Sequence, residues 1–86
     1  MMRVRYVGQS FGVDGLTNGK VYDVTAYEDW NGLLRVIDDS EEDYLYSAVR
    51  PAPLDGSGPG GYWEVVEDDE AGTLARVIPP RTGKTE

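Results

Sequence analysis

Apolar and polar residues alternate over several short runs of the chain, which is the pattern of half-buried β-strands. In residues 20–27, for example, Tyr22, Val24 and Ala26 fall on one face and polar residues separate them. Residues 33–38 are apolar on both faces, as is typical of a strand with a neighbour on each side. The predicted strands are residues 4–7, 20–27, 33–38, 44–46 and 62–67.

Turn-forming residues separate these runs. Asn18-Gly19 and Asn31-Gly32 are the strongest hairpin signals, because both residue types tolerate a positive φ. The acidic residues 38–43 predict another turn, and the Pro/Gly-rich residues 51–61 predict a loop. Residues 73–78 fit a sixth strand or a short helix, because their apolar residues match both periodicities.

Five short strands in 86 residues predict an all-β domain, either a small barrel or two orthogonal sheets. We expect this domain to span residues 1–78 and residues 79–86 to form a disordered tail. Alternation also predicts which side chains are buried. The predicted core residues are Val4, Tyr6, Tyr22, Val24, Leu34, Val36, Leu45, Trp63 and Val65.

The family resemblance of the chain rests on three segments: GLTNGKVYDV (residues 15–24), RVIDDSEEDYLY (35–46) and WEVVE (63–67). Together they resemble a family of small bacterial proteins of Firmicutes and their phages or prophages. The resemblance covers roughly residues 2–70 and implies an SH3-like barrel with five antiparallel strands, a long loop at residues 9–20 and one helical turn after Tyr46. It implies no activity and no catalytic residues.

Composition limits the catalytic groups, metal ligands and binding partners that the chain can have. It has no cysteine and no histidine, so the commonest general base, the commonest metal ligand and any thiolate are absent. Sixteen acidic against eight basic residues give a net charge of −8, which opposes binding to nucleic acid or anionic lipid. No run approaches the about 20 apolar residues of a membrane span, and the start lacks a signal-peptide pattern. We therefore expect a cytoplasmic monomer with no cofactor.

The acidic run at residues 38–43 has two interpretations. As a calcium loop it would need a glycine at the bend, which it lacks, and predicted strands rather than helices flank it. The favoured interpretation is a solvated hairpin turn. Paired carboxylates could also serve glycoside hydrolysis, but a chain of this length has little room for the required cleft. We therefore predict that the chain is not an enzyme.

Aromatic residues in or beside the predicted loops suggest a binding surface. In peptide-binding SH3 domains the corresponding loops hold a polyproline segment between aromatic walls. The candidate anchors and the acids beside them are Phe11, Tyr27, Trp30, Tyr46, Asp14, Glu28 and Asp29. The alternative, favoured because exposed single aromatic residues are common, is that Phe11 caps the open end of the barrel and the other aromatic residues are ordinary amphipathic residues at strand ends. The function predicted from this pattern is a non-catalytic protein-interaction module that binds a protein or peptide partner.

An alternative function is a mimic of nucleic-acid charge that blocks the DNA-binding surface of another protein. A mimic needs carboxylates spaced along one face, whereas a peptide binder needs an apolar groove with a few acids at its rim. Sequence leaves this choice open.

Overall fold

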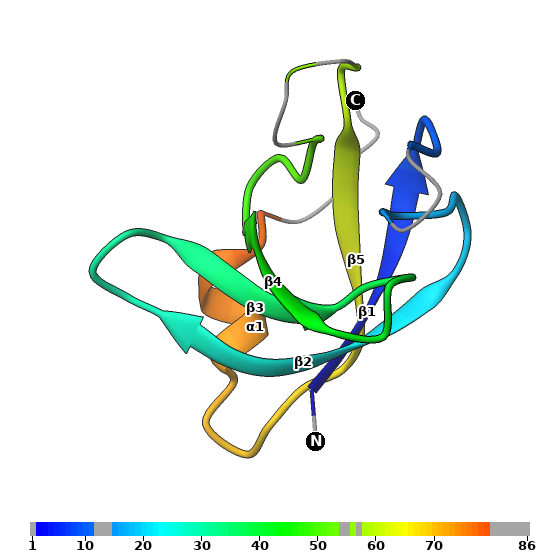
Figure 1. The fold of residues 1–86 in the computed structure, drawn as a ribbon. Coiled ribbons are helices and arrows are strands. Elements are labelled where there is room, and N and C mark those ends of the chain that lie inside the picture. The colour runs from blue at the N-terminus through cyan, green and yellow to red at the C-terminus, as the bar shows by residue number, and fades with distance from the viewer. Residues whose placement is uncertain (1, 12–14, 54–55, 57, 80–86) are drawn as a thin grey trace, which may run out of the picture.

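Five antiparallel strands and one short helix make up the computed structural model, which describes residues 2–11, 15–53, 56 and 58–79 (Figure 1). The strands form one sheet in the order β4-β3-β2-β1-β5. The elements are β1 (Met2–Gly8), β2 (Val21–Glu28), β3 (Leu33–Ile37), β4 (Asp43–Ser47), β5 (Gly61–Glu67) and α1 (Thr73–Val77). All five predicted strands are confirmed, and residues 73–77 form the helix of the two alternatives. The predicted tail lies almost wholly outside the described residues, as does part of the loop at residues 51–61.

Alternation places the core on one face of the sheet. In β2, Tyr22 and Val24 are buried and the residues between them are exposed. In β3, Leu34 and Val36 are fully buried, whereas the residues on the opposite face are only half-buried. The side-chain period of two in a strand therefore decides which residues enter the core.

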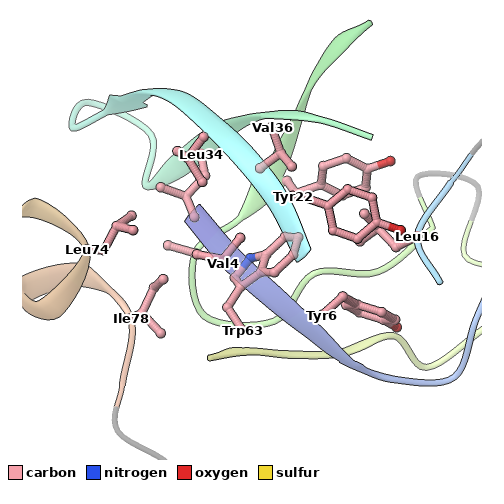
Figure 2. Packing of buried hydrophobic residues seen from close by; sticks show 12 residues of the cluster. Val4, Tyr6, Leu16, Tyr22, Leu34, Val36, Trp63, Leu74 and Ile78 are labelled. Atoms are coloured by element: carbon pink, nitrogen blue, oxygen red, sulfur yellow. The ribbon is translucent and has the colours of Figure 1, made fainter. Parts of the chain in front are cut away.

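Aromatic rings fill the centre of this core. The Trp63 ring lies 5.8 Å from the Tyr6 ring and 6.3 Å from the Tyr46 ring, both edge-to-face. Figure 2 shows Leu74 and Ile78 at one end of the cluster and Leu16, from the loop before β2, at the other. Edge-to-face contacts add about 0.5–1.5 kcal/mol per pair to the burial of apolar area, so Trp63 is a main contributor to stability.

The start of the helix α1 is held by the carboxylates of two acidic residues that precede it. The Asp68 carboxylate accepts hydrogen bonds from the backbone N–H groups of Leu74 (2.9 Å) and Ala75 (3.0 Å). The Asp69 carboxylate accepts one from the N–H of Thr73 (2.9 Å). These carboxylates satisfy N–H groups that lack partners within a helix, and they place Leu74 in the core.

The prediction that Leu45 and Val65 lie in the core is wrong. Leu45 is only half-buried, because β4 pairs Leu34 with Tyr46 and so places Tyr46, not Leu45, on the core face. Val65 is 40% exposed. It lies in the edge strand β5, where the register against β1 shifts between Arg3 and Val4.

The sheet does not close into a barrel. Its two edge strands are β4 and β5, and no ladder joins them in the part of the chain that the structure describes. Instead, the indole N–H of Trp63 in β5 donates a hydrogen bond to the backbone oxygen of Ser47 in β4 (2.9 Å). A side chain therefore joins the two edges at one point. The helical turn implied after Tyr46 is also absent from the described residues of that segment.

Candidate functional site

The predicted aromatic anchors do not form one surface. Phe11 is partly buried, and its ring lies 5.8 Å from that of Tyr6 and 6.3 Å from that of Tyr46. Tyr46 is itself buried, and Tyr27 packs against the core from the far end of β2. Phe11 and Tyr46 therefore pack into or against the core instead of forming an exposed aromatic surface with Trp30.

Trp30 differs from the other anchors, because it is 80% exposed. It lies in the turn at residues 29–32, where Gly32 has a φ of +73° and donates a hydrogen bond to the backbone oxygen of Glu28 (3.0 Å). This turn and the loop at residues 9–20 lie at opposite ends of β2 (Figure 1), so Trp30 and Phe11 are far apart. Trp30 is the predicted anchor that a partner could reach.

The predicted acids also have separate positions. Glu28 is bound to Arg35 through its carboxylate (2.6 Å), which lowers the pKa of Glu28. Asp29 is exposed beside Trp30, and Asp14 lies outside the described residues.

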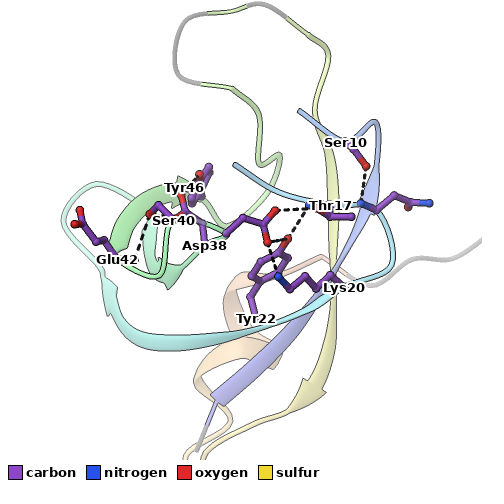
Figure 3. Close-up of polar contacts among 10 residues, drawn as sticks. Ser10, Thr17, Lys20, Tyr22, Asp38, Ser40, Glu42 and Tyr46 are labelled. Atoms are coloured by element: carbon purple, nitrogen blue, oxygen red, sulfur yellow. Dashed lines mark hydrogen bonds and ion pairs between the residues drawn. The ribbon is translucent and has the colours of Figure 1, made fainter. Parts of the chain in front are cut away.

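The prediction that the acidic residues 38–43 form only a solvated turn is wrong for Asp38. This residue is 5% exposed, and its carboxylate accepts hydrogen bonds from the Tyr46 hydroxyl (2.6 Å) and the Ser40 backbone N–H (2.9 Å) (Figure 3). Burial, together with the Asp38 carboxylate, raises the pKa of Tyr46 well above its usual value. The buried carboxylate is tolerated because these donors satisfy it.

Asp39 connects the acidic turn to the loop before β2. Its carboxylate accepts hydrogen bonds from Lys20 (2.7 Å), Thr17 (2.8 Å) and the Tyr22 hydroxyl (3.0 Å) (Figure 3). Its backbone N–H donates to the oxygen of Gly15 (3.0 Å). The loop before β2 and the acidic turn therefore lie side by side.

These contacts favour the charged forms of Asp39 and Lys20, which form an ion pair. Burial would raise the pKa of Asp39, but the hydrogen bonds from Lys20, Thr17 and Tyr22 outweigh burial and lower it. The hydrogen bond to Asp39 raises the pKa of Lys20. Each titratable group here is bound to another group of the same chain, so the cluster is suited to fastening two loops together. Among the described residues, no group of three or more ligand-type side chains is placed to hold a metal ion.

A groove of about 620 Å³ runs along β4, and sequence reasoning missed it. It lies within the usual size range of binding pockets, about 300–1,000 Å³. Its lining residues are Leu33, Arg35, Asp43, Tyr44, Leu45, Tyr46, Ser47, Arg50 and Ala52. The signal in the sequence is that residues 33–38 are apolar on both faces, a pattern that a central position in the sheet also explains.

The groove ends near the turn that carries Trp30. That turn leads directly into Leu33, and the backbone oxygen of Gly32 accepts a hydrogen bond from the N–H of Ala48 (3.3 Å). The next residue, Val49, is 61% exposed. Exposed apolar side chains thus flank the point where β3 begins and β4 ends. We refer to the groove together with Trp30 and Val49 as the β4 surface.

No family model, curated protein or solved structure matches the chain. Within the described residues, no helix has the length and apolar character needed to cross a membrane.

Proposed function

We propose that the chain is a small, non-catalytic protein-interaction module and that the β4 surface is where its partner binds. The observation that carries this proposal is the 80% exposure of Trp30, three residues before Leu33, which lines an apolar groove. Tryptophan is among the side chains that contribute most to binding energy at protein interfaces, and it loses little conformational freedom when bound. We further propose an SH3-like barrel as the fold type, supported by the five antiparallel strands and the contact between the two edges.

A non-catalytic role is supported by the state of the titratable side chains. The buried Asp38 and the half-buried Asp39 are each held by hydroxyl or ammonium donors of the same chain. A general acid or base must reach a proton of its substrate, and these carboxylates already face internal donors.

The charge-mimic alternative receives less support, because most carboxylates that could imitate phosphates are already ion-paired or hydrogen-bonded. The ion pairs are Asp23 and Glu67 with Arg3, Glu64 with Arg5, Glu28 and Asp43 with Arg35, and Asp39 with Lys20. Asp68 and Asp69 hold the start of α1. A mimic needs carboxylates that are free to face a partner.

The test of this proposal is quantitative capture of partners from the source cells by the immobilised chain and its Trp30→Ala variant. Losing a central tryptophan costs about 2 kcal/mol or more of binding energy, which lowers partner affinity about 30-fold. The melting temperature should change little, because an exposed side chain contributes little to folding. Val66→Ala, at a 45% exposed position on the other edge strand, is the matched control and should capture normally. Capture by Trp30→Ala equal to that of the wild type would refute the proposal.

A further inference from the structure

The hydrogen bonds at the two ends of the β3–β4 ladder show which backbone groups of β4 are free. At one end the N–H of Asp38 donates to the oxygen of Glu42 (3.2 Å), and at the other the N–H of Ala48 donates to Gly32 (3.3 Å). In an antiparallel ladder every second residue pair exchanges hydrogen bonds. Between these two ends, the residues of β4 that bond to β3 are therefore Tyr44 and Tyr46. The residues whose backbone groups face away from β3 are Asp43, Leu45 and Ser47.

These outward groups are mostly without partners. The Ser47 oxygen accepts the Trp63 indole N–H. Among the described residues, no hydrogen bond engages the outward N–H and C=O of Leu45. A row of unpaired N–H and C=O groups is a template for pairing with another strand.

The groove borders this free edge and extends over the outer face of β3, where Leu33 and Arg35 line it. Tyr44 and Tyr46 pair with core-facing residues of β3, Leu45 pairs with Arg35 on the opposite face, and all of them line the groove. Arg50 and Ala52 line it from the segment after β4. The groove therefore adjoins the edge to which an added strand would pair.

Charge in the groove indicates one property of the occupant. Of the two lining arginines, Arg35 is bound by Glu28 (2.6 Å) and Asp43 (3.6 Å). The guanidinium of Arg50 has no ion pair within the described part of the chain. The chain has twice as many acidic as basic residues, so an arginine left without a carboxylate in a groove is complementary to a carboxylate on a partner.

We propose that the β4 surface binds an extended peptide segment, which adds as a strand to the free edge of β4 and places a carboxylate against Arg50. This inference rests on the proposed function and names its ligand class. Main-chain hydrogen bonds to Leu45 would supply affinity, and Arg50 together with the apolar lining would select the side chains.

The test uses three short synthetic peptides with blocked ends and alternating valine and threonine. The first carries a glutamate near one end, the second has glutamine at that position, and the third is the glutamate peptide with every second backbone nitrogen methylated. Binding is measured by calorimetry at physiological salt. We expect the glutamate peptide to bind about tenfold tighter than the glutamine peptide, because a charged hydrogen bond replaces a neutral one. The net charge of −8 would by itself favour the glutamine peptide, so this preference requires a local cation.

Variants of the chain locate the site. Arg50→Gln should abolish the preference for glutamate. Arg76→Gln removes the same charge from α1, where the side chain has no ion pair within the described residues, and should leave the preference intact. Leu45→Pro removes one outward N–H without removing a bond to β3, so it should weaken all three peptides while the domain stays folded. The methylated peptide tests the same bonds without any variant and should bind at least about tenfold more weakly than its parent.

Several results would overturn the inference. Equal binding of methylated and unmethylated peptides would exclude strand addition, and an unchanged glutamate preference in Arg50→Gln would exclude the role of Arg50. Absence of binding by every peptide would also overturn it. Self-association of the wild-type chain that Leu45→Pro abolishes would identify a second copy as the occupant instead. In each case the proposed function stands or fails separately, on partner capture by Trp30→Ala.

Discussion

Trp63 holds the two open edges of the sheet together, so replacing it with phenylalanine tests how the fold is closed. The side chain is 1% exposed, and its indole N–H donates to the oxygen of Ser47 across the gap between β5 and β4. Phenylalanine keeps one aromatic ring against Tyr6 and Tyr46 but cannot donate this hydrogen bond. The substitution therefore removes the contact between the edges while preserving part of the core packing.

The expected loss of unfolding free energy in Trp63→Phe has two parts. Removing the donor and leaving a carbonyl without its partner costs about 1–3 kcal/mol. The unfilled part of the indole site adds about 1 kcal/mol, at about 24 cal/mol per Å³ of residual cavity. The total loss is about 2–4 kcal/mol. Small domains have an unfolding free energy as low as about 5 kcal/mol, so this loss is a large share of it. The loss corresponds to a melting temperature lower by at least about 10 °C for a domain of this size.

Urea unfolding followed by circular dichroism measures this loss. Trp30→Phe is the matched control, because it removes the same atoms from an 80% exposed side chain and should change stability by less than about 0.5 kcal/mol. The control also leaves Trp63 as the sole tryptophan, so its fluorescence reports on the core. A loss below about 1 kcal/mol in Trp63→Phe, no more than a single ordinary hydrogen bond contributes, would refute a structural role for the contact between the edges.

Three further predictions concern pH and backbone approach. Folding lowers the pKa of Asp39, so the ionised carboxylate stabilises the fold above about pH 4, and this contribution is lost as the pH falls through the pKa of the folded state. Asp39→Asn should therefore lower the urea midpoint at neutral pH and make that midpoint fall less steeply in acid. Folding raises the pKa of Tyr46, so the neutral hydroxyl stabilises the fold below about pH 10, and this contribution is lost as the pH rises further. Ultraviolet titration should show that Tyr46 ionises together with alkaline unfolding. Ionisation of Tyr46 in a domain that stays folded would contradict this. A Cβ at Gly61 would stand 2.1 Å from the oxygen of Val7, whereas one at Gly58 would meet nothing closer than 3.6 Å. Gly61→Ala should therefore lose about 1–3 kcal/mol in urea unfolding and Gly58→Ala less than about 0.5; equal losses would show that the close approach of β1 and β5 is unimportant.

Strand positions could be predicted from the sequence because polar residues interrupt the apolar runs at regular intervals. The face of β4 that points into the core could not be predicted. Residues 44–46 are all apolar, so alternation has no polar residue to mark the outer face. The choice between Leu45 and Tyr46 is made by the register against β3, which pairs Tyr46 with Leu34. A shift of one residue in register would reverse it.

The polar cluster around Asp38 and Asp39 could not be predicted because most of its partners come from distant segments of the chain. An acidic run is usually solvated, and nothing local distinguishes a carboxylate that meets a buried hydroxyl. One signal was present: Tyr22 and Tyr46 fall on or beside core positions, and a buried tyrosine hydroxyl needs a hydrogen-bond partner. The surplus of acids next to the turn at residues 38–43 made those carboxylates the nearest candidates.

The aromatic residues of the loops look alike in sequence but differ in the chain around them. Phe11 forms an isolated bridge with the buried Leu16 and packs against the core. Trp30 lies in a turn too short to fold back, between a polar residue on each side. Loop length, rather than residue type, therefore decided which aromatic side chain remained exposed.

The two edges of the sheet differ in a way that supports a partner at β4. On β5 a register shift disrupts the strand, and Glu64 and Glu67 hold charged pairs beside it; bulges and charges are common protection against unwanted pairing. The edge of β4 has a regular register along its length and an apolar groove beside it. Pairing between two copies would bring together chains of net charge −8, which opposes self-association. An edge that is shaped for pairing, in a chain whose charge discourages pairing with itself, is best explained by a different strand that covers it.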